Sequence, residues 1–224
     1  LIQAGAIGDF TSYLVRSIGM KDAKYWSNGV FGQAKRSCWR AYKGMAGGGI
    51  LVMNAVHNLD ALYYMTGATP VEVMAMGGNY SSRSALEDSM SLLIRFREHD
   101  SYGVCQAMSA AHGASHTDNS TFIYGTKGTL RIPEPNKFSR CAWLDQGGER
   151  RELPCTGGYT ELWRGAGVAE MARSLLTGRA PMLDARFAYH TQEVIQAVYD
   201  SCESKRYICV NSDLPRHCRT PLEV

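Results

Sequence analysis

The sequence lacks any apolar run of the roughly 18–20 residues that a helix needs to cross a bilayer, and its first residues do not resemble a signal peptide. It also lacks a block of one charge, because 24 Lys and Arg residues are scattered among 21 Asp and Glu residues, for a formal net charge of +3. No basic stripe is present that would suit a phosphate backbone. We therefore expect neither a membrane nor a nucleic acid among the partners of this chain.

Paired cysteine motifs are absent as well. The seven cysteines are an odd number without CxxC spacing, at positions 38, 105, 141, 155, 202, 209 and 218. This is typical neither of a disulfide framework nor of a zinc site, and it predicts a reducing, cytoplasmic location. His112, His116 and His190 are metal ligands by residue type, but no regular spacing of acidic residues or histidines accompanies them. We predict no metal.

The composition and patterning that remain are those of a globular α+β protein. With 224 residues, 45% of them hydrophobic and 20% charged, the chain can bury a substantial core. Short links at 98–101 and 125–128 suit hairpins between neighbouring strand-like runs, so we predict an antiparallel meander. The expected strands lie at about 10–18, 71–80, 89–98, 102–110, 119–125, 128–132, 139–145 and 207–210.

Three helices are expected around this sheet. The first runs from about Gly49 to Met65 and ends before Gly67 and Pro70. Two amphipathic helices near the end of the chain should close the domain, which makes the class α+β with helices grouped against the sheet. Their apolar stripes are Val168, Met171, Leu175 and Leu176 in one helix, and Phe187, Val194, Ile195, Val198 and Cys202 in the other.

The two ends of the chain differ from its middle. Residues 1–9 resemble the last turn of a helix closed by glycine, and a domain seldom begins there, so we expect an N-terminal portion that is not represented. Residues 10–210 form the expected domain, and residues 211–224 look like a loose tail.

The most informative segment is GGGILVMNAVHNLD, residues 47–60, an apolar helical run that carries Asn54, His57, Asn58 and Asp60. Burial of an unpartnered polar side chain costs about 1–3 kcal/mol, so these groups are either satisfied structurally or line a pocket. At 100° per residue Asn54, His57 and Asn58 share one arc, and such side chains suit a polyhydroxyl substrate. The alternative is a core histidine at position 57, hydrogen-bonded to the backbone or to Asp60.

The glycine triplet allows two interpretations. Backbone N–H groups at a helix start attract phosphate, but the pattern is neither GxGxxG nor GxxxxGK[ST] and it follows a loop. Close approach of the backbone to a neighbouring element or a ligand is the other use of residues without side chains. Trp39, Arg40 and Lys43 belong to the long loop just before the triplet and could reach the same pocket.

Several segments, in order, resemble the C-terminal domain of the Gfo/Idh/MocA oxidoreductases. They are LIQAGAIGDF (1–10), WRAYK (39–43), GGGILVMNAVHNLDALYYMTG (47–67), FIYGTKGTLRI (122–132) and the stretch from SLLTGRAPMLDAR to QAVYDSCESKRYICV. The resemblance implies a large open, mostly antiparallel sheet with helices on one face, as in the C-terminal domains of dihydrodipicolinate reductase and glyceraldehyde-3-phosphate dehydrogenase. It also implies homodimers or homotetramers formed through the sheet.

The resemblance implies an activity for the intact protein. A preceding Rossmann domain would bind NAD or NADP, and hydride would pass between the nicotinamide and a sugar, cyclitol or related alcohol. His57 matches the family's site histidine and is the expected catalytic residue. Asn54 matches a substrate-facing asparagine, while Arg40, Lys43 and Trp39 are expected substrate contacts. Asp60 matches an acidic residue with a structural role.

Two departures from the family pattern limit this expectation. Inositol-dehydrogenase-like members have an aspartate four residues before the histidine, where this chain has Met53. The family's nucleotide-binding glycines and catalytic lysine belong to the nucleotide domain, so the chain alone should be inactive and its cofactor-binding residues are unknown. The rival interpretation is a non-catalytic carbohydrate-binding or assembly module that uses the exposed sheet face.

Overall fold

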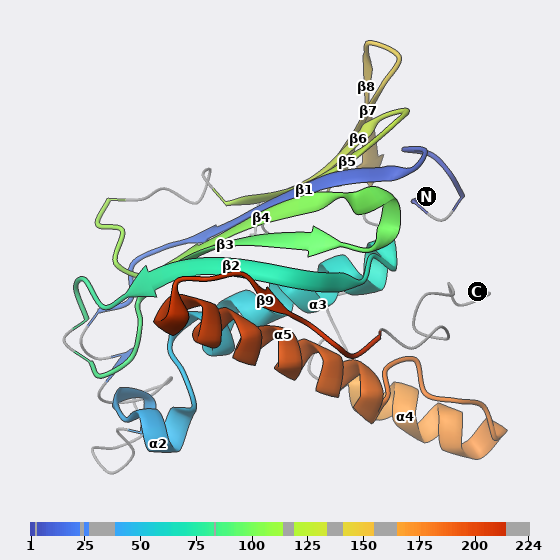
Figure 1. Ribbon diagram of the computed structural model, residues 1–224. Helices are drawn as coiled ribbons and strands as arrows, with labels where there is room; N and C mark the ends of the chain where they lie inside the picture. The colour runs from blue at the N-terminus through green and yellow to red at the C-terminus, as the bar shows by residue number, and fades with distance from the viewer. Residues whose placement is uncertain are drawn as a thin grey trace.

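A nine-stranded sheet forms the centre of the computed structural model, which describes residues 1–2, 4–22, 25–26, 39–82, 84–113, 119–133, 141–154 and 165–213 (Figure 1). The strands are β1 (Phe10–Ile18), β2 (Pro70–Gly78), β3 (Ser89–Phe96), β4 (Tyr102–Met108), β5 (Ser120–Gly125), β6 (Thr129–Pro133), β7 (Cys141–Gln146), β8 (Glu149–Pro154) and β9 (Ile208–Cys209). The helices are η2 (Trp39–Ala41), α2 (Lys43–Ala46), η3 (Leu51–Ala55), α3 (Val56–Thr66), η4 (Glu98–Asp100), α4 (Ala166–Thr177) and α5 (Ala185–Ser204).

The strand order is β8-β7-β6-β5-β1-β4-β3-β2-β9. The predicted hairpins β3–β4 and β5–β6 are confirmed, but the continuous meander is wrong. β1 lies between β4 and β5, parallel to the first and antiparallel to the second. Its register puts Leu14 opposite both Val104 and Phe122, far apart in sequence. Alternation of apolar residues marks a strand but does not specify such distant partners.

One face of the sheet is covered by helices and the other is open. In β3 the side chains of Leu92, Ile94 and Phe96 are buried, whereas Leu93 and Arg95 are exposed. Figure 1 shows α3 and α5 on the same side of the sheet, and these helices contact each other and, through α5, strand β2. The α+β class with an open, mostly antiparallel sheet and helices on one face is therefore confirmed.

The open face carries an apolar band that crosses the strands. Register pairs Met74 with Leu93, Leu93 with Val104, Val104 with Leu14 and Leu14 with Phe122. At the far end the Arg131 guanidinium lies 5.5 Å from the ring centre of Phe122 and 5.4 Å from that of Trp143. We call Met74, Leu93, Val104, Leu14, Phe122 and Trp143 the open-face band.

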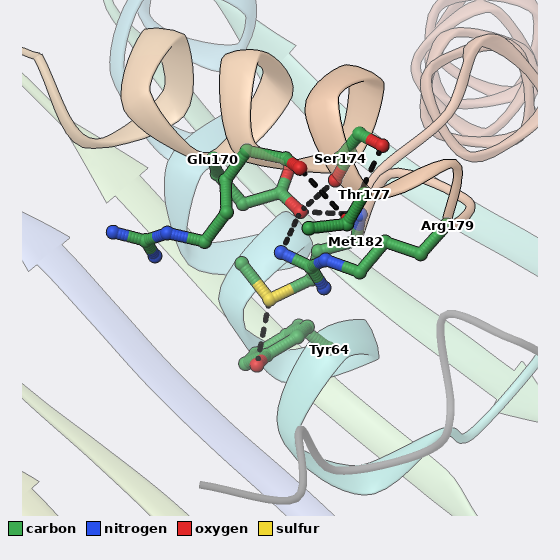
Figure 2. A network of polar contacts seen from close by, with 7 residues as sticks. Tyr64, Glu170, Ser174, Thr177, Arg179 and Met182 are labelled. Atoms are coloured by element: carbon green, nitrogen blue, oxygen red, sulfur yellow. Dashed lines mark hydrogen bonds and ion pairs between the residues drawn. The ribbon is translucent and has the colours of Figure 1, made fainter.

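The two C-terminal helices differ in how they pack. The stripe of α5 is confirmed, with Phe187, Val194, Ile195 and Val198 buried. The stripe expected to bury α4 is wrong, because Leu175 and Leu176 are 76% and 88% exposed. α4 is held instead by a polar network around Glu170 (Figure 2), whose Oε1 accepts hydrogen bonds from Ser174 Oγ (2.8 Å), Arg179 Nη2 (3.1 Å) and the Met182 N–H (3.1 Å).

Three further features bear on the expectations above. Burial raises the pKa of the Cys105 thiol to about 12, which makes this cysteine a packing group. The described helices include none with the length and apolarity to cross a membrane. Residues 211–213 contact α5, because the Glu193 carboxylate accepts hydrogen bonds from the N–H groups of Asn211 (3.0 Å) and Ser212 (2.9 Å). The rest of the predicted tail lies outside the described residues.

Candidate functional site

The start of the glycine-led helix is capped by a carboxylate from another part of the chain. Glu87, which precedes β3, accepts hydrogen bonds from the Gly49 N–H (2.8 and 2.9 Å) and the Leu51 N–H (3.2 Å). Its own carbonyl oxygen accepts the Ile50 N–H at 3.0 Å. The N–H groups that a helix leaves unpaired at its start are thus satisfied by an internal anion. The phosphate-cradle interpretation of the triplet is wrong for this reason.

Close approach of the backbone explains two of the three glycines. A Cβ atom on Gly48 would lie 1.8 Å from the Tyr199 hydroxyl oxygen, and one on Gly49 would lie 1.9 Å from the Glu87 carbonyl oxygen. The Tyr199 hydroxyl in turn donates to the Glu87 carboxylate at 2.9 Å. Burial, and then the Glu87 charge, raise the pKa of Tyr199 well above its ordinary value. Helix α5 and the segment before β3 therefore fix the start of the site helix.

The first turn of this helix is not α-helical. Leu51–Ala55 forms the π-helical turn η3, closed by the Val56 N–H donating to the Leu51 carbonyl five residues earlier. The predicted single α-helix is wrong over these residues. Single π turns are frequent at functional sites, since the extra residue changes which side chains face a neighbouring surface. Asn54, a predicted substrate contact, lies in this turn.

Asn54 is joined to a tyrosine that the sequence patterns did not single out. The Tyr25 hydroxyl donates to Asn54 Oδ1 at 3.3 Å. Tyr25 also packs edge to face against the buried Trp26, with ring centres 5.4 Å apart. Both aromatics follow β1, in a segment that the sequence predicted as a long loop, and large aromatic side chains there were the only signal for them.

The same tyrosine brings two cations to Asn54. The Arg40 guanidinium lies 5.0 Å from the Tyr25 ring centre and 4.3 Å from that of Trp39. The Lys21 ammonium lies 5.0 Å from the Tyr25 ring centre. Two of the five predicted site residues, Asn54 and Arg40, thus contact Tyr25, and a third, Trp39, joins them through Arg40. We call Lys21, Tyr25, Trp39, Arg40 and Asn54 the aromatic–cation cluster.

His57 is exposed, one turn after Asn54 on the same helix. The core-histidine interpretation is therefore wrong. Asp60 is half-buried and accepts a hydrogen bond from the Thr191 hydroxyl at 2.7 Å, which ties α3 to α5. Burial raises the pKa of Asp60, while the Thr191 hydrogen bond and the charge of His57 oppose that shift. His57 therefore has a solvent-accessible ring.

The other predicted positions are not members of the aromatic–cation cluster, and one of them lies outside the described residues. Lys43 is exposed on the short helix α2, and Met53 is half-buried in the π turn. His190 is buried beside Ser212, with Nδ1 2.8 Å from the serine oxygen, and His112 Nε2 lies 3.3 Å from Ser81 Oγ. His116 is not among the described residues, and those described include no group of three possible metal ligands.

Comparison with known proteins decides the family. Residues 1–131 match the GFO/IDH/MocA C-terminal domain, which is more than half of the chain. The chain belongs to the GFO/IDH/MocA family. The resemblance predicted from the ordered segments is thereby confirmed, and the glycine-led helix with Asn54 and His57 lies within the matched residues.

Solved structures share the fold of this GFO/IDH/MocA domain. Aldose-aldose oxidoreductase from Caulobacter crescentus, complexed with glycerol, is 21% identical with a TM-score of 0.75, and the match covers 93% of this chain and 58% of that one. Levoglucosan dehydrogenase in complex with NADH and levoglucosan is 20% identical with a TM-score of 0.75, covering 94% and 61%. WlbA dehydrogenase from Bordetella pertussis, in complex with NADH and UDP-GlcNAcA, is 19% identical with a TM-score of 0.71, covering 95% and 58%. The present chain spans less than two thirds of each of these relatives.

Proposed function

We propose that this chain is the C-terminal substrate-binding and oligomerisation domain of an NAD(P)-dependent oxidoreductase that acts on a sugar, cyclitol or related alcohol. The observation that carries the proposal is the aromatic–cation cluster at the start of the glycine-led helix. Aromatic faces, an amide and a guanidinium group make up a surface that suits a polyhydroxyl ligand. The related enzymes named above, two of them complexed with NADH, support an oxidoreductase.

In this proposal the residues of the chain bind and orient the alcohol and carry its proton. Asn54, oriented by the Tyr25 hydroxyl, donates its amide hydrogens to a substrate hydroxyl. His57 accepts the hydroxyl proton when the alcohol is oxidised and returns it in the reverse direction. A bound nicotinamide cofactor would supply the acceptor for the hydride of the carbinol carbon. A preceding nucleotide-binding domain would hold the cofactor, so the chain alone would be inactive.

The open-face band supports self-association as part of the same proposal. Leu93 lies in the middle of the band, between its apolar register partners Met74 and Val104, and is nevertheless 44% exposed to solvent. A second copy of the chain laid face to face would remove this surface from water. We propose a homodimer or homotetramer built on this face.

The rival function is a carbohydrate-binding or assembly module without catalysis. Met53 favours it, because a thioether replaces the acid that some family members place four residues before the histidine. A screen of sugars and cyclitols with NAD and NADP, followed by the absorbance of reduced nicotinamide, separates the two functions. Turnover by the full-length protein supports the enzyme. Sugar binding without turnover contradicts it. Turnover by residues 1–224 alone would instead contradict the assignment of the cofactor to a preceding domain.

A further inference from the structure

The charges around Tyr25 are unbalanced within the described part of the chain. Each of five other arginines has a carboxylate within ion-pair distance, namely Arg95, Arg97, Arg150, Arg179 and Arg186. Neither Arg40 nor Lys21 has such a partner among the described residues, although both lie about 5 Å from the same ring. The Asp22 carboxylate, next to Lys21 in the sequence, accepts the Tyr25 N–H at 3.0 Å.

The Arg40 guanidinium and the Lys21 ammonium each lie 5.0 Å from the centre of the Tyr25 ring, so they are at most about 10 Å apart and their like charges repel each other. The π faces of Tyr25 and Trp39 offset part of this repulsion. They also hold the guanidinium plane of Arg40 in place before any ligand arrives, which lowers the entropy cost of binding. The Arg40 Nε lies buried without a hydrogen-bond acceptor among the described residues.

We propose that the substrate is anionic: a sugar or related alcohol that carries a carboxylate or a phosphate ester, bound by Arg40 and Lys21 while a hydroxyl group reaches Asn54. This inference rests on the proposed function and names the substrate class of that site. A guanidinium group recognises carboxylate and phosphate through paired charge-assisted hydrogen bonds. Tyr25 contacts both Asn54 and Arg40, so a single small molecule can bind the anion site and the hydroxyl site at the same time.

Calorimetric titration of the full-length protein tests this proposal. The probes are D-glucuronate, D-glucose 6-phosphate and the neutral D-glucose, each at low and high salt. We expect at least one anion to bind about tenfold or more tightly than glucose, with the preference shrinking in high salt. Arg40→Gln and Lys21→Gln should each lower the affinity for the anion by a larger factor than the affinity for glucose, so that the preference shrinks. Lys127→Gln removes one exposed charge from the β5–β6 turn and serves as the matched control.

The outcomes separate this proposal from the proposed function. Equal binding of glucose and both anions, unchanged in Arg40→Gln, overturns the anionic substrate but leaves the sugar site. Failure of all three probes to bind overturns both. The phosphate of NADP is another source of the same anion, so NAD and NADP are titrated as well. A loss of NADP binding in Arg40→Gln with unchanged glucuronate binding overturns the proposal. Arg40→Lys keeps the charge and should retain part of the preference if Arg40→Gln fails to fold.

Discussion

The Tyr199 hydroxyl donates to the Glu87 carboxylate at 2.9 Å, and the same carboxylate caps the first turn of the glycine-led helix. One acidic side chain thus connects α5, the segment before β3 and the helix that carries Asn54 and His57. Helix N-termini attract negative charge, and hydrogen bonds to a charged group stabilise more than neutral ones. The position of the candidate site therefore depends on residues outside it.

Replacement of the capping charge should destabilise the fold. Glu87→Gln keeps one acceptor oxygen but loses the negative charge and one acceptor of the Gly49 N–H. We expect a loss of about 1–3 kcal/mol in the free energy of unfolding, measured by urea denaturation. Glu149→Gln, at an exposed position in β8, is the control and should have little effect. Equal stability of the two variants would contradict the capping role.

The glycines should differ in their tolerance of a methyl group. In Gly49→Ala the new Cβ meets the Glu87 carbonyl oxygen at 1.9 Å, so backbone must move, and we expect a loss of roughly 1–3 kcal/mol or more. Gly44 lies in α2 with open space around it, and Gly44→Ala should be neutral or stabilising by up to about 1 kcal/mol. Thermal unfolding of both variants measures this difference in stability. Equal melting temperatures would show that the close approach at Gly49 is not needed.

Acid should weaken the attachment of α4. The hydrogen bond from Ser174 holds the pKa of Glu170 below its ordinary value of 4.5, with further help from the Met182 N–H and Arg179. Because the folded pKa is lower than the unfolded one, this stabilisation is complete above the unfolded pKa and is lost as the pH falls through the folded pKa. The melting temperature of the wild type should therefore fall more steeply below about pH 5 than that of Glu170→Gln. Parallel curves for the two proteins would contradict this role.

The exposed stripe of α4 and the buried stripe of α5 give opposite expectations for similar substitutions. Leu176 is 88% exposed, so Leu176→Ala should change the free energy of unfolding by no more than about 0.5 kcal/mol. Val194 is fully buried, and Val194→Ala should cost roughly 1–3 kcal/mol through lost burial and a cavity. Denaturant titration of the domain measures both. A large loss for Leu176→Ala would mean that α4 buries this face in solution.

Local patterning predicted the buried stripe of α5 and most strands, because apolar periodicity and hairpin links act over a few residues. It missed β8, whose sequence ERRELP is rich in charge and whose solvent-exposed position at the sheet edge needs no apolar alternation. It also misassigned the α4 stripe, since periodicity shows that one face is apolar but not whether anything covers it. The parallel pairing of β1 with β4 joins distant segments and has no local signal.

The candidate site was predictable in part for similar reasons. Asn54 and Arg40 could be named because their residue types stand out in and just before an apolar helix. The Glu87 cap could not, because it depends on a carboxylate 36 residues or more away along the chain. The π turn also had no signal in the sequence patterns. Tyr25 escaped notice because a tyrosine in a loop has many ordinary roles. Only its hydrogen bond to Asn54 and its cation contacts single it out.

The catalytic assignment depends on His57. In the full-length protein, His57→Ala should lower kcat/KM about 10²–10⁴-fold, as removal of a positioned acid–base group does. A merely structural histidine at this exposed position would leave the pH profile unchanged, so loss of one limb of the kcat/KM profile is the sharper readout. His112→Ala removes another exposed histidine and serves as the control. A decrease of less than about threefold would remove His57 from the proton-transfer step and leave Asn54 and the aromatic–cation cluster as a binding surface.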